Sequence, residues 1–210
     1  MIRAATWFCD DHCGVFTPGA KSWRRKSPAN ISSEEMLAFI ARPLKYLPRM
    51  TRESRSCLAA ASLALNACKW KEPESREIGL VAAGYEGCLQ ADQDYFSDYV
   101  ASGRTLGRGN LFIYTLPSST MGEVAIALGL RGPTLHIHDA DHPAAALIVH
   151  AQRLIDDGET DAILALWSDP RAAVCVALDG AAEHPDLSGV NWDQSPLAMA
   201  QGLAAMVQPT

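Results

Sequence analysis

The order of predicted strands and helices indicates an α/β fold with a mostly parallel sheet. Short apolar segments at residues 78–83, 134–138 and 162–167 are separated by helical patterns at residues 121–130 and 143–157. Strands that alternate with helices of this length are typical of parallel sheets covered by helices. The chain has 210 residues, of which 48% are hydrophobic and 20% charged. This composition suits one domain with a substantial core and excludes a disordered chain.

The N-terminal half gives the following elements. Residues 2–8 predict a first strand, and residues 10–32, rich in Gly, Pro, Ser and charge, predict a loop. A Ser cap with acidic residues in the first turn predicts a short helix over residues 32–41. Apolar residues at spacings of three and four predict a helix over residues 51–68, and residues 90–102 predict a surface helix.

The C-terminal half ends with a predicted strand at residues 172–178 and a polar tail after residue 180. The Gly/Arg segment 103–110 lacks the Lys-Ser/Thr pair of a phosphate-binding loop and predicts a flexible connection. The helix at residues 143–155 carries only His150, Gln152 and Arg153 as polar residues. A helix that is apolar around most of its circumference is expected between two layers. We therefore expect this helix to be central and to need more protein around it than the chain supplies.

Charge and hydropathy exclude further classes of protein. The net charge of −6 argues against general nucleic-acid binding, and no apolar run approaches the roughly 18 residues of a membrane helix. The acidic N-terminus has no signal-peptide core, so we expect a cytoplasmic protein. Residues 21–26, together with Arg49, Arg52 and Arg55, make the N-terminal quarter basic. This basic region is either a solvated face or a surface for an acidic partner.

The six cysteines are scattered, and several lie within apolar segments. Reduced thiols used as small core residues are the expected interpretation. The one tight group is Cys9-Asp-Asp-His12-Cys13. A zinc site usually has a fourth ligand and a second paired spacing, and the sequence offers neither, so no metal is expected there.

Several motifs occur in the order seen in one enzyme family. Residues 128–133 (LGLRGP) and 158–161 (GETD) flank the apolar helix, with RMTR at residues 49–52 and the strand at residues 78–81 upstream. Over residues 45–180 the sequence resembles the N-terminal half of the β-ketoacyl-ACP synthases, the ketosynthases. The resemblance implies a single thiolase-like half-fold over residues 1–210, with an insertion at 10–45 and a tail at 180–210.

The resemblance also locates the site of condensation chemistry. Counting from residues 132–133, the nucleophilic Cys of the family falls on Asp141. Condensation needs a thiolate at a helix N-terminus, where the dipole lowers the thiol pKa. A carboxylate at this place is a helix cap and a poor acyl carrier. In the family, two His residues (or a His and an Asn) assist decarboxylation, and they lie in the C-terminal half of the fold, which the resemblance does not cover. The chain alone is therefore not expected to condense acyl groups.

The segment 136–142 (HIHDADH) has its own chemistry. Imidazole and carboxylate groups together suit zinc or iron, and His136 and His138 lie on one face of a strand while His142 opens the next helix. These three histidines are the candidate metal ligands, and Asp141, His138 and His142 the candidate catalytic residues. The downstream ligands of a metallohydrolase are missing, so the expected state is a vestigial pocket with no metal or other cofactor.

Two classes of function remain. The first is a non-catalytic ketosynthase-like partner or scaffold in fatty acid or polyketide biosynthesis. It would pair as a homodimer or with a ketosynthase, near the strand 134–138 and the following helix, and could dock an acyl carrier protein. The second is a hydrolase or lyase, with or without a metal, that uses the cluster from His136 to His142. Neither class involves nucleic acid or a membrane span.

Overall fold

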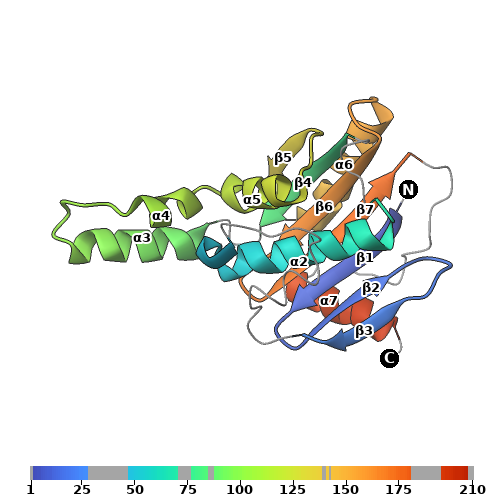
Figure 1. Ribbon diagram of the computed structural model, residues 1–210, viewed down its shortest axis with the longest axis horizontal. Helices are drawn as coiled ribbons and strands as arrows, with labels where there is room; N and C mark the ends of the chain where they lie inside the picture. Colours follow the sequence, from blue (N-terminus) through green and yellow to red (C-terminus); the bar gives the residue numbers. More distant parts are fainter. Residues whose placement is uncertain are drawn as a thin grey trace.

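The computed structural model describes residues 2–27, 47–70, 77–84, 88–138, 141, 143–180 and 195–207 (Figure 1). The predicted helix at residues 32–41 lies outside this part of the chain. The strands are β1 (Ile2–Cys9), β2 (His12–Phe16), β3 (Trp23–Lys26), β4 (Ile78–Gly84), β5 (Thr134–Ile137), β6 (Ala162–Ser168) and β7 (Ala172–Asp179). The helices are η1 (Leu47–Arg49), α2 (Arg52–Ala67), α3 (Leu89–Ala101), α4 (Gly109–Phe112), η3 (Ile113–Thr115), α5 (Ser118–Leu128), α6 (Pro143–Asp156) and α7 (Pro196–Ala205).

The strands form one sheet in the order β3-β2-β1-β7-β6-β4-β5. The α/β class is confirmed, and β5 and β6 belong to the same sheet as predicted. The prediction of a mostly parallel sheet is wrong, because only β4 with β5 and β4 with β6 pair in parallel and the other neighbours are antiparallel. The reason is local: β6 and β7 are joined by a tight turn in which Asp169 Oδ1 accepts hydrogen bonds from the backbone N–H groups of Arg171 and Ala172, at 2.7 and 2.8 Å. Strands joined by so short a turn pair antiparallel.

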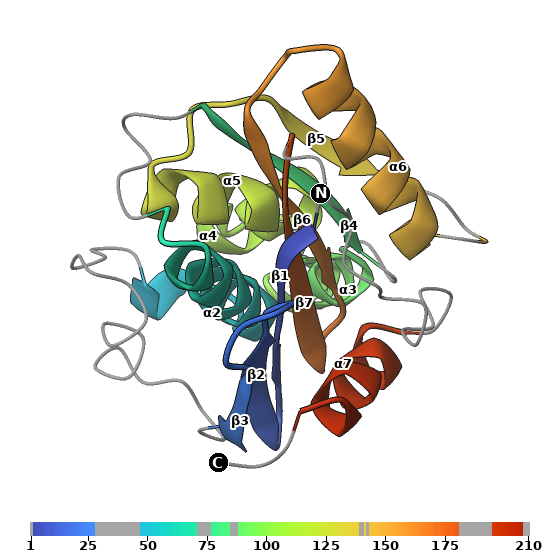
Figure 2. The same cartoon turned by 90° about the vertical axis from the view of Figure 1, so that its right-hand side faces the viewer.

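Both faces of the sheet are covered by helices (Figure 2). Successive side chains of β6 point to opposite faces of the sheet and pack against the helices on each face. Leu164 and Leu166 pack on the face covered by α2 and α5, whereas Ile163 and Trp167 pack on the face covered by α6 and α7. Helix α2 is buried along most of its length and lies across β1, β7 and β6 at the centre of the first layer. The core therefore consists of two apolar clusters, one on each face of the sheet.

Helix α6 does not have the position that the sequence predicts. Only Pro143, Ala144, Leu147 and Ala151 of this helix are buried, and Val149 is 49% exposed. The helix packs one side against the sheet, and among the described residues nothing covers its other side (Figure 2). The expectation of a central helix between two layers is not met within this chain.

Two segments predicted to lack regular structure contain elements. The predicted loop at residues 10–32 contains β2 and β3, which extend the sheet beyond β1 as an antiparallel meander. The predicted polar tail contains α7, which begins at Ser195, whose hydroxyl accepts a hydrogen bond from the N–H of Ala198, and has Pro196 in its first turn. A Ser cap followed by Pro is a helix-start signal that the sequence analysis did not use.

Helices α3 and α4 form an arm that projects from the body (Figure 1). No residue of α3 is buried, as the predicted surface helix requires. The arm is held by packing of the Tyr95 and Phe112 rings at 5.5 Å and by an ion pair between Arg108 and Asp98 at 2.9 Å. Among the described helices, none alone has the length and hydropathy to cross a membrane. The pair Gly109–Thr115 and Ser118–Leu128 reaches these limits only jointly and is bent by 103°.

Candidate functional site

A cavity of about 450 Å³ lies at the carboxyl ends of the parallel strands. Ala83 and Gly84 at the end of β4, His136 near the end of β5 and Ser168 at the end of β6 contribute to its lining. Loops and helix N-termini meet at this edge of an α/β sheet, which is where such folds bind ligands. The size is within the range of small-molecule sites.

The N-terminus of α2 forms one wall of the cavity. Thr51 caps the helix by accepting a hydrogen bond from the N–H of Ser54 at 3.1 Å. Glu53, in the first turn, accepts a hydrogen bond from the Ser168 hydroxyl at 2.7 Å. A carboxylate in the first turn is stabilised by the helix dipole. The Glu53–Ser168 contact thus ties helix α2 to the end of β6 at the base of the cavity.

Helices α3 and α5, with the segment between them, close the other side. Tyr114 lines the cavity and its hydroxyl donates to Glu123 Oε1 at 3.2 Å. Burial and the negative charge of Glu123 raise the pKa of Tyr114 to about 12, so the phenol stays protonated at neutral pH. The Ser54 hydroxyl lies 3.0 Å from the Thr120 hydroxyl and links the first turns of α2 and α5. The wall therefore offers hydroxyl groups on an otherwise apolar surface.

One thiol lines the cavity among the described residues, that of Cys88. It donates hydrogen bonds to the backbone oxygen of Thr115 at 2.9 Å and to Asp92 Oδ2 at 3.2 Å. Burial, followed by the contact with Asp92, raises the pKa of this thiol above its ordinary value. Reactive cysteines instead have lowered pKa values. Cys88 is therefore a poor nucleophile at neutral pH.

The other cysteines of the described chain are also free thiols, as the sequence predicts. Cys57 and Cys175 are fully buried, and burial raises both thiol pKa values well above the ordinary range. They are core residues.

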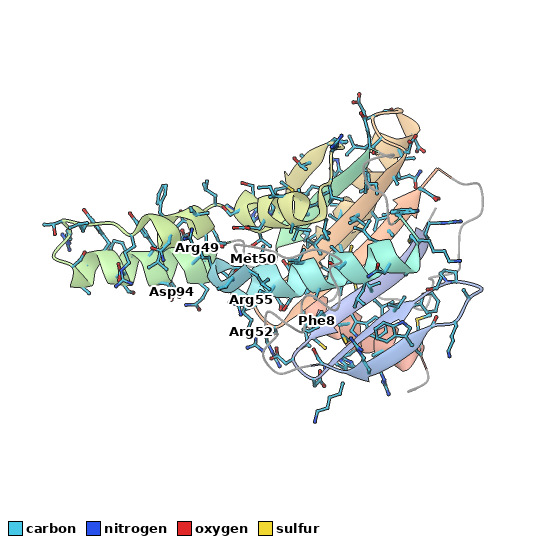
Figure 3. The ribbon with its side chains drawn as sticks, viewed as in Figure 1. Phe8, Arg49, Met50, Arg52, Arg55 and Asp94 are labelled. Carbon is cyan, nitrogen blue, oxygen red and sulfur yellow. The ribbon has the colours of Figure 1, made fainter. Side chains whose placement is uncertain are left out.

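Three arginines lie near the N-terminus of α2: Arg49 ends η1, and Arg52 and Arg55 belong to the first turn of α2 (Figure 3). Arg52 lines the cavity, as do the acidic residues Glu53, Asp94 and Asp169. The positive charges of Arg55 and Arg49 act on Tyr114, which places them close to the lining. Arg52 forms an ion pair with Asp10, and an Arg55 Nη2 donates to the backbone oxygen of Pro48 at 3.3 Å.

The structure separates the residues that the sequence singled out. His136 is half-buried and lines the cavity, and burial, followed by the charge of His138, lowers its pKa. His138 and Asp141 are exposed and do not contribute to the lining. His142 lies outside the described residues. The structure describes two of the three predicted metal ligands, so the three-histidine site stays a prediction.

Sequence reasoning missed most of the lining. Glu53 directly follows the RMTR segment, in which only the arginines attracted attention. Ser168 directly follows the apolar strand at residues 162–167 and belongs to no recognisable motif. A usable signal was present, since both follow the rule that polar residues at carboxyl ends of parallel strands and at helix N-termini meet at one edge. Cys88 precedes α3 and Tyr114 belongs to η3, and the sequence does not predict where these two segments lie.

Comparisons with known proteins agree on one family. The sequence model described as "Beta-ketoacyl synthase, N-terminal domain" matches residues 30–169. A beta-ketoacyl synthase structure from Burkholderia phymatum aligns with 65% of this chain and 44% of its own length, at 18% identity and a TM-score of 0.55. This chain thus spans less than half of that synthase. No curated protein matches the sequence significantly.

Two further structures are complexes by description. A ketosynthase with its chain length factor from Xenorhabdus doucetiae aligns with 96% of this chain and 91% of its own, at 14% identity and a TM-score of 0.57. The ishigamide ketosynthase/chain length factor aligns with 88% and 63%, at 11% identity and a TM-score of 0.61. At these identities the likeness establishes the fold, and it confirms the half-fold that the sequence resemblance implied.

Proposed function

Because the chain belongs to the beta-ketoacyl synthase N-terminal domain family, we propose that it is a ketosynthase-like subunit without condensing activity of its own. It would serve as a partner or scaffold in fatty acid or polyketide-type biosynthesis. The observation that carries this proposal is a formed cavity whose described lining holds one thiol, that of Cys88. The sequence resemblance adds that Asp141, which lies outside this lining, aligns with the nucleophile of the family. Aspartate cannot hold an acyl chain as a thioester, and the cavity thiol, Cys88, has a raised pKa.

Acyl loading tests this directly. The purified chain is incubated with an acyl-thioester donor, and its intact mass is measured, with an authentic ketosynthase treated in parallel as the positive control. No adduct is expected. An adduct that is lost in Cys88→Ser would refute the proposal and identify Cys88 as the residue that carries the acyl group. An adduct that persists in this variant would also refute it, with another residue as the acyl carrier.

Assembly is the second part of the proposal. In the described chain, β5 is an edge strand whose only sheet neighbour is β4. Leu135 on β5 is 38% exposed, and the two helices that contact β5 carry exposed apolar residues as well: Ile126 of α5 is 78% exposed and Val149 of α6 is 49% exposed. An unpaired edge between two apolar helix faces invites pairing with another chain. Two of the structures that share this fold are ketosynthase and chain length factor complexes, which supports a heteromer with a ketosynthase; the homodimer is the second form of the proposal and rests on the edge strand alone.

Light scattering distinguishes the outcomes. A charge at the edge, Leu135→Lys, should shift a dimer to a 22.6 kDa monomer, whereas Met206→Lys, at a residue of similar exposure outside the proposed interface, should not. A wild-type monomer at micromolar concentration argues against the homodimer. A wild-type chain that also stays monomeric with a ketosynthase refutes the assembly proposal.

An acyl carrier protein is the small partner that three arginines near the cavity favour. Arg52 lines the cavity, and Arg49 and Arg55 act on its lining residue Tyr114; basic residues at an interface accelerate association with acidic partners. Charge reversal at Arg55 should weaken carrier binding and reduce its dependence on salt. Charge reversal at Arg131, which is exposed just before β5 and outside the cavity lining, serves as the control. Equal binding by both variants would remove the carrier from the proposal.

The alternative, a hydrolase or lyase, has one supporting observation, the position of His136 in the cavity lining. His138 and Asp141 lie outside that lining, so the residues from His136 to His142 support a hydrolase or lyase less than they support a pocket that has lost its catalytic residues. Turnover of a thioester or ester by the purified chain, abolished by His136→Gln, would favour the alternative. The cytoplasmic location stays a prediction.

A further inference from the structure

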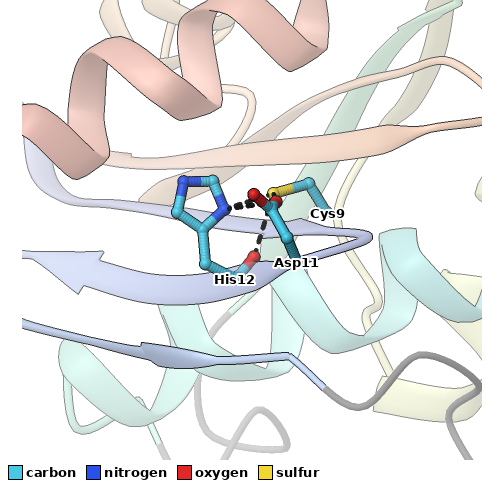
Figure 4. Close-up of side chains that lie close together, drawn as sticks. All are labelled: Cys9, Asp11 and His12. Atoms are coloured by element: carbon cyan, nitrogen blue, oxygen red, sulfur yellow. Dashed lines mark hydrogen bonds and ion pairs between the residues drawn. The ribbon is translucent and has the colours of Figure 1, made fainter.

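The turn between β1 and β2 brings three different metal-binding groups together (Figure 4). Cys9 Sγ lies 2.5 Å from His12 Nδ1 and 3.2 Å from Asp11 Oδ1. The carboxylate oxygen lies 3.1 Å from the same imidazole nitrogen. Among the described residues, this is the group of Cys, His and acidic side chains whose ligand atoms converge on one point.

The residues that supply the sulfur and the nitrogen are held by the sheet. Cys9 ends β1, where it is paired with Ala172 of β7, and His12 begins β2, where it is paired with Lys26 of β3. The His12 ring packs edge-on against Trp7 at 6.2 Å. Ligands placed on paired strands need little ordering when a metal binds.

The turn has an open side. Cys9 is 1% exposed, but the Asp11 side chain is 78% exposed and the His12 side chain 16% exposed. A cation can therefore enter from the side of Asp11, and water can complete its coordination. Three protein ligands and a water are an established arrangement for zinc. Water can therefore be the fourth ligand, whose absence from the sequence argued against a metal here.

The choice of cation follows from the donors. Thiolate, imidazole and carboxylate together suit Zn²⁺ and exclude Mg²⁺ and Ca²⁺, which prefer oxygen ligands. Ligands at about 2.0–2.3 Å from a tetrahedral zinc are about 3.3–3.8 Å apart, so the sulfur and nitrogen need to separate by about 1 Å and the two distances to the carboxylate oxygen need to lengthen by only about 0.3 Å. A rotation of the His12 ring or of the Cys9 side chain is sufficient for that change.

We propose that Cys9, Asp11 and His12 form a binding site for a thiophilic divalent cation, Zn²⁺ above all, which ties the β1–β2 turn. The site is separate from the cavity, although its neighbour Asp10 is ion-paired with Arg52 of the cavity lining. Burial raises the pKa of the Cys9 thiol to about 12 in the metal-free protein. Zinc binding therefore displaces a proton, and affinity should rise with pH.

The test uses tag-free protein stripped with a chelator and then titrated with Zn²⁺, and in parallel with Co²⁺ as a spectroscopic probe. One equivalent of Zn²⁺ should bind and raise the melting temperature. Co²⁺ should give a thiolate charge-transfer band and the visible bands of tetrahedral cobalt. Cys9→Ser should abolish the charge-transfer band, and His12→Gln should weaken binding at least about tenfold, since loss of an outer-sphere contact alone costs 10–100-fold.

Matched controls come from the same turn and from another thiol. Asp11→Asn should weaken binding, whereas Asp10→Asn, at the adjacent acid that faces Arg52, should leave it unchanged. Cys88→Ser should likewise keep the cobalt spectrum. The proposal is overturned if the wild type binds no stoichiometric Zn²⁺, or if Cys9→Ser, shown to be folded by circular dichroism, binds Zn²⁺ and Co²⁺ as the wild type does.

Discussion

Replacement of Gly132 by alanine should destabilise this protein more than any ordinary surface change. A Cβ at this position would lie 2.5 Å from the Gly79 nitrogen, 2.6 Å from the Ile78 carbonyl carbon and 2.9 Å from the Gly79 Cα. All three are backbone atoms of β4, so no side chain can rotate away. The chain segment before β5 crosses the start of β4 at this point, and only a residue without a Cβ permits the approach.

The magnitude follows from what must move. Backbone must separate by roughly 0.5–0.9 Å to restore ordinary contact, in a core that packs as densely as a crystal. Overpacking of this kind costs about 1–3 kcal/mol. The shift also strains two hydrogen bonds at the crossing, Gly132 N to Ile78 O at 3.0 Å and Leu80 N to Pro133 O at 2.9 Å, each worth about 0.5–1.5 kcal/mol. We expect Gly132→Ala to lower the free energy of unfolding by roughly 2–5 kcal/mol.

Urea unfolding followed by circular dichroism measures this change. Gly122→Ala is the matched control, because a Cβ at Gly122 in α5 meets nothing within 4 Å. That substitution should stabilise the protein by about 0.5–1 kcal/mol, the ordinary gain in helix propensity. The reasoning is refuted if the midpoints of the two variants shift in the same direction, or if Gly132→Ala unfolds within about 0.5 kcal/mol of the wild type at an unchanged m-value.

Three further predictions concern the cavity. Burial, followed by the charge of His138, lowers the pKa of His136, so the unfolded chain takes up a proton at a higher pH than the folded chain does. The free energy of unfolding should therefore fall as the pH drops below about 6.5. Urea titrations at several pH values measure this dependence, which His136→Gln should reduce. Cys88 should react with iodoacetamide at pH 7.5 more slowly than free cysteine, and Asp92→Asn should accelerate the reaction as followed by mass spectrometry; faster labelling of the wild type would contradict the raised pKa. Ser168→Ala removes a donor to the half-buried Glu53 carboxylate and should cost about 1–3 kcal/mol of unfolding free energy, with no loss if water replaces the hydroxyl.

Periodic segments of this sequence predicted their structures well. The helix at α2 and the strands β4, β6 and β7 combine clear hydrophobic patterns with strong burial, so local preference and packing agree. Strand direction was not predictable in the same way. The turn between β6 and β7 makes them antiparallel through the Asp169 side chain, and nothing in the periodicity of either strand carries that information.

Short, weakly apolar elements were missed for a different reason. Strand β2 contains Gly14, whose Cα approaches Trp7 and the backbone oxygen of Trp23 so closely that any Cβ would clash. A glycine in such a place reads as a loop signal, although it marks a close contact between neighbouring strands. The candidate site shares this limit, because its lining comes from segments distant in sequence that meet only in the folded chain.

The exposed edge of the sheet bears on the proposed assembly. Complete burial of an aliphatic side chain is worth about 1.5–3 kcal/mol. Leu135, Ile126 and Val149 are already partly buried in the chain, so an interface could gain only a fraction of that free energy from each. Counted twice for a two-fold interface, this gain is comparable with the 4–15 kcal/mol or more that association costs. The edge side chains alone therefore cannot make a tight complex. Backbone pairing along β5 and contacts by the arm, where Phe96 and Leu106 are 63% and 73% exposed, have to add the remainder. A dimer balanced in this way should dissociate when one lysine replaces Leu135, because the two-fold axis places that charge in the interface twice.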